Sequence, residues 1–150
     1  MKLAALDANS LLNRAFYAIR PLSTRGGEYT NAVFGFLSHY FKILDELAPD
    51  AVCACFDVHA PTFRHLEFSG YKAGRRPCPE ELIPQFDLLR EILDAMGVPR
   101  AELAGFEADD LLGTVSLLCE ERGGWECVVV TGDRDSLQLA GASTNVRLIT

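Results

Sequence analysis

Three short apolar runs in this sequence each end at an aspartate, and this pattern limits the folds open to the chain. The runs are Leu3-Ala-Ala-Leu-Asp7, Val52-Cys-Ala-Cys-Phe-Asp57 and Val128-Val-Val-Thr-Gly-Asp133. Short β-rich runs that alternate with helical patterns predict parallel strands joined by helical crossovers. We therefore expect an α/β fold with a mainly parallel central sheet flanked by helices on both faces.

The segments between these runs have the apolar spacing of three and four residues that is typical of amphipathic helices. The residues expected on their buried faces include Ile83, Met96 and Leu118. Gly97 is expected to end the helix that begins at Pro79. The expected helices are 9–18, capped by Asn9 or Ser10; 31–47, capped by Asn31; 79–96, beginning at Pro79-Glu80-Glu81; 107–122; and a short helix at 134–139.

Carboxylates gather where the carboxyl ends of the predicted strands would lie. In open parallel sheets this edge forms the crevice in which ligands bind. Crowded carboxylates repel one another, and divalent cations bound through oxygen ligands relieve that repulsion. The sequence therefore predicts a Mg²⁺ or Mn²⁺ site in a phosphoryl-group enzyme. Its expected ligands are Asp7, Asp57, Glu107, Asp109, Asp110, Asp133 and Asp135.

Each acidic segment also has a purely structural explanation. The acids from Glu107 to Asp110 could serve to cap a helix, although one acid suffices for a cap. Asp133 and Asp135 could form a polar turn and the cap of the next helix. Asp7 and Asp57 are each weak signals alone, because aspartate often follows a strand. The coincidence of four such segments at one sheet edge favours the metal site.

The composition indicates one globular domain spanning residues 1–150, with 49% hydrophobic and 23% charged residues. No apolar run approaches the roughly 20 residues that cross a bilayer, so we expect no membrane partner. Met1-Lys2 leads directly into a strand-like run, which predicts a cytoplasmic protein without a secretory signal. Five cysteines without paired Cys-x-x-Cys spacing predict reduced thiols rather than a zinc site. The chain also has no Walker loop, G-x-G-x-x-G motif or strained serine elbow.

Residues 58–79 interrupt the alternation of strands and helices with prolines, glycines and a cluster of positive charge. The chain as a whole has a net charge of −7, which alone argues against a nucleic-acid partner. A basic segment beside a metal-charged crevice can nevertheless hold a phosphate backbone, and an aromatic ring beside it can stack on a base. A solvated surface loop is the alternative. The residues concerned are Arg64, Tyr71, Lys72, Arg75 and Arg76.

Several stretches distributed over the whole chain form a recognisable set of motifs. They are Asp7-Ala-Asn-Ser10 with Arg14-Ala-Phe16, Thr30-Asn-Ala-Val-Phe-Gly-Phe36, Phe56-Asp57, Pro61-Thr-Phe-Arg-His65, Tyr71-Lys-Ala73 with Pro79-Glu-Glu-Leu82, Glu107-Ala-Asp-Asp110 and Thr131-Gly-Asp-Arg-Asp135. In this order they resemble the N-terminal 5′ nuclease domain of bacterial DNA polymerases I and the flap endonucleases of the PIN-like superfamily. The resemblance implies a PIN-like, resolvase-like fold.

The resemblance also implies a function and roles for individual residues. Family members use divalent metal ions to hydrolyse DNA phosphodiesters at a free 5′ end or a 5′ flap in replication and repair. The seven acids correspond to the family's metal ligands, with Asp7, Asp110 and Asp133 catalytic. Residues 63–79 correspond to its helical arch, in which Lys72 contacts the scissile phosphate. The remaining implied nucleic-acid contacts are Arg14, Arg64, Tyr71, Arg75 and Arg76.

The chain departs from the family pattern at Ala8, Asn13, His59-Ala60 and Gly74, none of which is an expected ligand. Family members continue with a helix-hairpin region that grips the duplex, and this region is absent from the 150 residues. We therefore expect either a fragment of a longer protein, which could include a polymerase domain, or a short relative that needs a partner. A non-catalytic nucleic-acid-binding module and a PIN-type endoribonuclease remain alternative functions.

Overall fold

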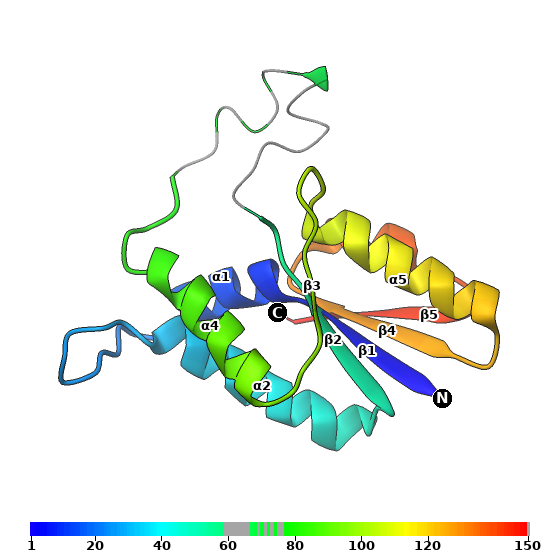
Figure 1. Cartoon of the computed structure of the whole chain (residues 1–150), viewed down its shortest axis with the longest axis horizontal. Helices are drawn as coiled ribbons and strands as arrows, with labels where there is room; N and C mark the ends of the chain where they lie inside the picture. The colour runs from blue at the N-terminus through cyan, green and yellow to red at the C-terminus, as the bar shows by residue number, and fades with distance from the viewer. Residues whose placement is uncertain (59–66, 69, 71, 73, 75–76, 150) are drawn as a thin grey trace.

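A five-stranded sheet forms the centre of the molecule (Figure 1). The computed structural model describes residues 1–58, 67, 68, 70, 72, 74 and 77–149. All strand pairs are parallel, and their order across the sheet is β3-β2-β1-β4-β5. The strands are β1 (Lys2–Asp7), β2 (Ala51–Cys55), β3 (Arg100–Ala101), β4 (Glu126–Thr131) and β5 (Thr144–Leu148).

Helices cover both faces of this sheet. One face carries α1 (Ala8–Ala18), α2 (Asn31–Leu47) and α4 (Ile83–Ala95). The opposite face carries α5 (Ala108–Arg122), with the 3₁₀ helix η1 (Arg134–Leu139) beside it (Figure 1). The α/β fold class predicted from the sequence is confirmed.

The central strands are buried on both faces, because their alternating side chains enter two separate cores. Leu6 of β1 packs in the core below α1, α2 and α4, together with Phe36 and Leu89. Its neighbour Ala5 points to the other face and packs in the core below α5 with Leu112. The continuous apolar runs of the sequence are therefore a consequence of two-sided burial.

The order of the strands brings the ends of β1 and β4 together. From β1 the chain moves outward through β2 and β3, and it then returns to the other side of β1 to form β4 and β5. Leu6 is in register with Val130, so both strands end at the same level. A reversal of this kind opens a crevice at the carboxyl ends of the strands.

The caps of two helices differ from those predicted. The N-cap of α1 is Asp7 rather than Asn9 or Ser10, and its Oδ1 accepts a hydrogen bond from the Ser10 amide at 3.1 Å. This occurs because the strand passes into the helix without a loop. Asn31 does not cap α2, since its N-cap is Thr30. The Asn31 side chain is buried and donates to the carbonyls of Phe16 and Ile19, at 3.0 and 3.1 Å, which ties α2 to the end of α1.

One predicted helix start and parts of two predicted buried faces are also wrong. The helix expected from Pro79 begins at Ile83, and Glu80 and Glu81 lie in the turn before it. Ile83 and Met96 are 45% and 40% exposed, and Leu118 of α5 is 57% exposed. The buried face of α5 includes Ser116 instead, because its hydroxyl is satisfied by the Thr144 hydroxyl at 2.7 Å. Such a pairing is invisible to apolar periodicity.

None of the helices within the described residues combines the length and apolar character needed to cross a membrane. All five cysteines are free thiols, and Cys78 is exposed whereas Cys55, Cys119 and Cys127 are buried.

Candidate active site

A cavity of about 210 Å³ lies at the carboxyl edge of the sheet, beside the N-terminus of α5. We call it the acidic cavity. Lys72 lies in its wall and forms an ion pair there with Glu107, at the start of α5. The acidic residues that line the cavity are Asp7, Asp57, Glu107, Asp109, Asp133 and Asp135.

Asp110 is the predicted ligand that does not line the acidic cavity. It lies in the first turn of α5, and its Oδ2 accepts a hydrogen bond from the Glu107 amide at 3.0 Å. The helix-capping explanation of the sequence therefore applies to this residue. Its carboxylate fixes the start of α5, which carries the acids that do line the cavity.

Asp7 is the most deeply buried of these acids, with 3% of its surface exposed. It lies where β1 ends and α1 begins, so both of its oxygens meet neighbouring donors. Oδ1 accepts from the Ser10 amide at 3.1 Å, and Oδ2 accepts from the Thr131 hydroxyl at 2.7 Å. These bonds fix the carboxylate at the meeting point of β1 and β4.

Thr131 and Ser10 hold that meeting point together, and the sequence patterns did not identify them as site residues. The Thr131 hydroxyl also accepts from the Asp133 amide at 3.0 Å, and it lies 3.1 Å from the Ser10 hydroxyl. The Ser10 hydroxyl accepts from the Gly132 amide at 2.9 Å. A hydroxyl residue within three positions of Asp7 and of Asp133 was the available signal. Such residues are common at strand ends, so the signal is weak.

Asp57 lies just beyond the end of β2 and spans the gap between α1 and α5. Its amide donates to the Asn9 side-chain oxygen at 2.9 Å, and its Oδ1 accepts from the Ala108 amide at 2.6 Å. The N-terminus of α5 therefore points an amide at this carboxylate, as helix dipoles favour.

The two remaining segments combine structural and site roles. Glu107 is the N-cap residue of α5, is 8% exposed and forms an ion pair with Lys72. Asp133 is the N-cap of η1, and its Oδ1 accepts from the Asp135 amide at 2.9 Å. The polar-turn explanation of Asp133 and Asp135 is thus realised, and the same turn directs both residues to the cavity.

The electrostatics of the acidic cavity oppose full ionisation. Burial raises the pKa of the Asp7 carboxyl, and the hydrogen bonds from Thr131 and Ser10 offset this in part. The pKa of Asp109 is raised to about 6, first by burial and then by the negative charges of Asp7, Asp133, Asp57 and Glu107. A cation inside the cavity would reverse both effects.

The donor set of the cavity fits a hard divalent cation. Carboxylate oxygens, supplemented by the amide and hydroxyl oxygens of Asn9 and Ser10, are the ligands that Mg²⁺ and Mn²⁺ prefer. Within the part of the chain that the structure describes, no three histidine, cysteine or acidic side chains already converge closely enough to hold a metal ion.

A second, larger pocket of about 850 Å³ adjoins the acidic cavity and shares Ser10, Asn13 and Asp133 with it. Its lining also includes the basic side chains of Arg14 and Arg134, and His39. Arg14 is the predicted nucleic-acid contact that the structure describes besides Lys72. The predicted contacts Arg64, Tyr71, Arg75 and Arg76 lie outside the described residues.

Comparison with known sequences reveals close relatives along the whole chain. The sequence profile of the "5′-3′ exonuclease, N-terminal resolvase-like domain" family matches residues 2–150. The chain is 46% identical over 146 residues to DNA polymerase I of Mycobacterium leprae and 44% identical over 147 residues to that of Geobacillus stearothermophilus. These matches cover 96% and 98% of the chain, but only 16% and 17% of the two polymerases.

Solved structures share the fold at lower sequence identity. The T5 D15 protein co-crystallised with metal ions superposes with a TM-score of 0.72 at 18% identity, over 97% of this chain and 54% of that one. The catalytic core of Rad2 in complex with a DNA substrate gives a TM-score of 0.58 at 19% identity, over 99% and 44% of the two chains. The resemblance predicted from the motifs is confirmed: this chain belongs to the family of 5′-3′ exonuclease N-terminal, resolvase-like domains.

Proposed function

We propose that this chain is the metal-dependent catalytic domain of a 5′ nuclease that hydrolyses phosphodiester bonds at a 5′ end or 5′ flap of DNA. The observation that carries the proposal is the acidic cavity, in which acids from four separate segments and Lys72 line one space of about 210 Å³. Family membership supports the same activity. The T5 and Rad2 structures were obtained with metal ions and with DNA, respectively, which agrees with the proposed cofactor and substrate.

The acids that line the cavity would hold the divalent ions, which we expect to be Mg²⁺ or Mn²⁺. When bound, such ions lower the pKa of a water molecule and neutralise charge on the phosphate. Asp7 and Asp57 are suited to this role because their neighbours already fix their carboxylates. Asp110 contributes by fixing the start of α5.

The remaining residues would act on the substrate. The ammonium group of Lys72 reaches Glu107 at the cavity wall, so a phosphate oxygen bound there would find a donor for the charge that develops during hydrolysis. Arg14, in the adjoining pocket, would contact the phosphate backbone on the side of α1. The predicted contacts Arg64, Tyr71, Arg75 and Arg76 would add charge and stacking.

The curated relatives are several times longer than this chain, which suits a nuclease domain that works beside a polymerase region. We propose that the whole protein removes 5′ ends during DNA replication and repair in the cytoplasm. A helix-hairpin region that grips the duplex, expected from the resemblance, would complete the DNA-binding surface.

The proposal is tested by incubating the chain with a 5′-labelled DNA flap, the matching RNA flap and a blunt duplex. We expect cleavage of the DNA flap with Mg²⁺ or Mn²⁺ and none with EDTA. Asp133→Asn should abolish cleavage, whereas Asp45→Asn, at an exposed position of α2, should not. Cleavage in EDTA, or retained cleavage by Asp133→Asn, would contradict the assignment.

A second candidate function is a non-catalytic nucleic-acid-binding module. It is the function that remains if the acidic cavity binds no metal ion. Calorimetric titration with Mn²⁺ separates the two functions, because the enzyme requires metal binding in the cavity and the module does not. Preferential cleavage of the RNA flap would instead identify a PIN-type endoribonuclease.

A further inference from the structure

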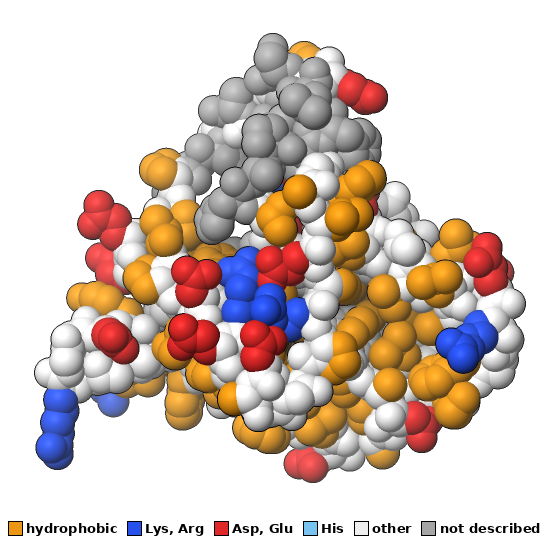
Figure 2. Space-filling model, viewed as in Figure 1, with side chains coloured by type: hydrophobic (Ala, Val, Ile, Leu, Met, Phe, Trp, Pro, Cys, Tyr) orange, Lys and Arg blue, Asp and Glu red, His pale blue; other side chains and the backbone are white. Residues whose placement is uncertain are grey.

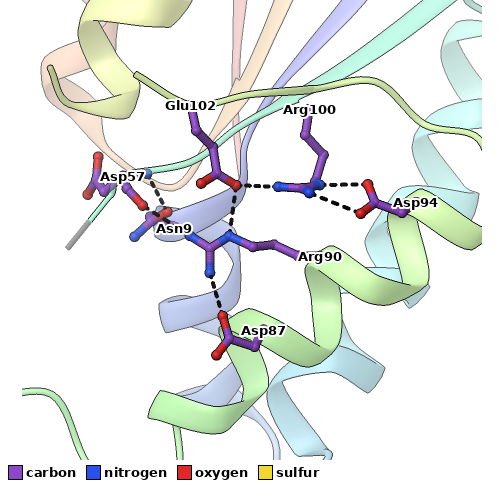
Figure 3. A network of polar contacts seen from close by, with 7 residues as sticks. All are labelled: Asn9, Asp57, Asp87, Arg90, Asp94, Arg100 and Glu102. Atoms are coloured by element: carbon purple, nitrogen blue, oxygen red, sulfur yellow. Dashed lines mark hydrogen bonds and ion pairs between the residues drawn. The ribbon is translucent and has the colours of Figure 1, made fainter. Parts of the chain in front are cut away.

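A network of charged residues lies beside α4, on the face shown in Figure 2, where Lys and Arg side chains gather among acidic ones. Figure 3 shows the members of this network, which contacts the candidate ligand Asp57 through a hydrogen bond from Arg90. We call it the Arg90–Arg100 network; it consists of Asp87, Arg90, Asp94, Arg100 and Glu102. Building on the proposed function, we infer that Arg90 is a positioning residue that holds the Asp57 carboxylate in place for metal binding.

The position of Asp57 explains why it needs such support. The last backbone hydrogen bond that ties β2 to the segment of β3 runs from the Phe56 amide to the Ala101 carbonyl, at 3.0 Å. At Asp57, side chains rather than neighbouring strands form the hydrogen bonds to the backbone. The Asn9 side chain accepts from the Asp57 amide at 2.9 Å, and Arg90 Nη2 donates to the Asp57 carbonyl at 3.1 Å (Figure 3).

These two contacts hold the amide and the carbonyl of Asp57, and they come from two different helices. Asn9 lies in α1 and Arg90 lies in α4, so the Asp57 backbone is clamped between them. With the backbone held, Oδ1 meets the Ala108 amide at 2.6 Å. Orientation of a ligating carboxylate by such surrounding contacts is what tunes metal affinity in proteins.

Arg90 is itself held in a single position, as a positioning residue must be. Its side chain is 14% exposed, and its guanidinium carbon lies 4.6 Å from the centre of the Phe56 ring. Nε donates to Glu102 at 2.8 Å, and Nη1 contacts Asp87 at 3.3 Å. Each of the three guanidinium nitrogens therefore has an acceptor, and the third is the Asp57 carbonyl.

The network contains its own matched control. Arg100 contacts the same Glu102 oxygen as Arg90 and binds Asp94 through two nitrogens, at 2.7 and 3.0 Å. The contacts of its guanidinium group are with Asp94 and Glu102, so it shares the network without holding Asp57. A general loss of network stability should appear in variants of both arginines, whereas a positioning effect should appear in variants of Arg90 alone.

The experiment compares Mn²⁺ titrations of the unmodified chain, Arg90→Met, Arg90→Lys and Arg100→Met by calorimetry. Amide hydrogen exchange at Asp57 and Ala108 is measured on the same proteins. We expect Arg90→Met to weaken Mn²⁺ binding about tenfold and to speed exchange at both amides. Arg90→Lys should show an intermediate loss, because a lysine lacks the fork that reaches three acceptors, and Arg100→Met should match the unmodified chain within about twofold.

Each outcome bears on the inference. Equal weakening in Arg90→Met and Arg100→Met, or unchanged Mn²⁺ binding and exchange in the Arg90 variants, overturns the positioning role while leaving the proposed nuclease function intact. If Arg90→Met does not fold, Arg90→Lys decides in the same way. An unmodified chain that binds no Mn²⁺ overturns both the positioning role and the proposed function.

Discussion

The acidic cavity and the Arg90–Arg100 network hold acidic side chains in opposite ways. In the network, each of the three acids contacts an arginine, and Glu102 contacts two. In the cavity, six acids line the wall with one basic side chain among the described residues, Lys72, whose ion pair is with Glu107. The two regions meet at Asp57, whose carbonyl belongs to the network and whose carboxylate faces the cavity.

The acids of the network stabilise the fold through their arginine partners, whereas the acids of the cavity are arranged, in the proposed function, to bind a further cation. Arg100 lowers the pKa of Asp94, as expected for an acid whose ionised form is favoured. Burial and neighbouring acids instead raise the pKa of Asp109 to about 6, so its ionised form is disfavoured. A fold gains nothing from such crowding, which is why an additional cation is the natural partner of the cavity.

The largest expected effect is on cleavage when a cavity acid is neutralised. Asp7→Asn should lower the cleavage rate of a 5′-flap DNA by about 100-fold or more, because a metal ligand is lost. The variant should still fold, since burial already disfavours the charge of Asp7. Single-turnover cleavage with Mg²⁺ measures the effect.

The network supplies the control for that prediction. Asp87→Asn removes an acid of which 85% of the side chain is exposed and which contacts Arg90 at 3.3 Å. It should change cleavage by less than about twofold, since exposed ion pairs contribute little. Similar losses in both variants would show that the two regions do not differ in kind.

The second prediction concerns stability and applies to the network. Glu102→Gln removes the charge that Arg90 and Arg100 share, on a side chain that is 24% exposed. We expect a loss of roughly 1–2 kcal/mol in the free energy of unfolding, measured by urea denaturation. Mn²⁺ binding should change little, because Arg90 keeps its contact with the Asp57 carbonyl. Unchanged stability relative to the exposed control Glu91→Gln would contradict this view of the network.

The sequence predicted the acidic cavity better than it predicted the network, for a physical reason. Asp7, Asp57 and Asp133 follow apolar runs, and parallel pairing of the strands brings their carboxyl ends to one edge of the sheet. Arg90 and Glu102 are joined by packing of α4 against the segment of β3, and no local pattern marks that contact.

The same limit explains the smaller differences between what the sequence suggested and where the structure places individual residues. Asn9, Ser10 and Asn31 are all common helix caps, and propensity cannot tell which of them turns inward to bind another element. Asp110 shares its motif with Asp109, yet only Asp109 lines the cavity. Which acid of a helix-opening group caps the helix depends on backbone geometry that spacing does not determine.

The third prediction uses the pH dependence of the metal-free chain. The folded state holds the Asp109 proton up to a pKa of about 6, whereas the unfolded state releases it near 3.8. Stability should therefore fall as pH rises from about 4 to about 6. Asp109→Asn should reduce this fall, with a gain at pH 7 on the order of 1 kcal/mol once solvent screening is included. Thermal unfolding in EDTA from pH 4 to 7 measures it, and parallel curves for both proteins would contradict the crowding of the cavity.

The smallest expected effect has the opposite sign and lies in the network. Because Arg100 lowers the pKa of Asp94, this pair contributes stability above the ordinary value of 3.8 and loses it as pH falls below that value. Asp94→Asn should therefore flatten the acid limb of the stability curve while leaving the limb between pH 4 and 6 unchanged. The effect should be small and should shrink in high salt, since 56% of the Asp94 side chain is exposed. Acid unfolding at two salt concentrations tests this prediction. If Asp94→Asn instead altered the stability between pH 4 and 6, Asp94 would behave like the crowded acids of the cavity. The distinction between acids paired with arginines and the crowded acids of the cavity would then fail at Asp94.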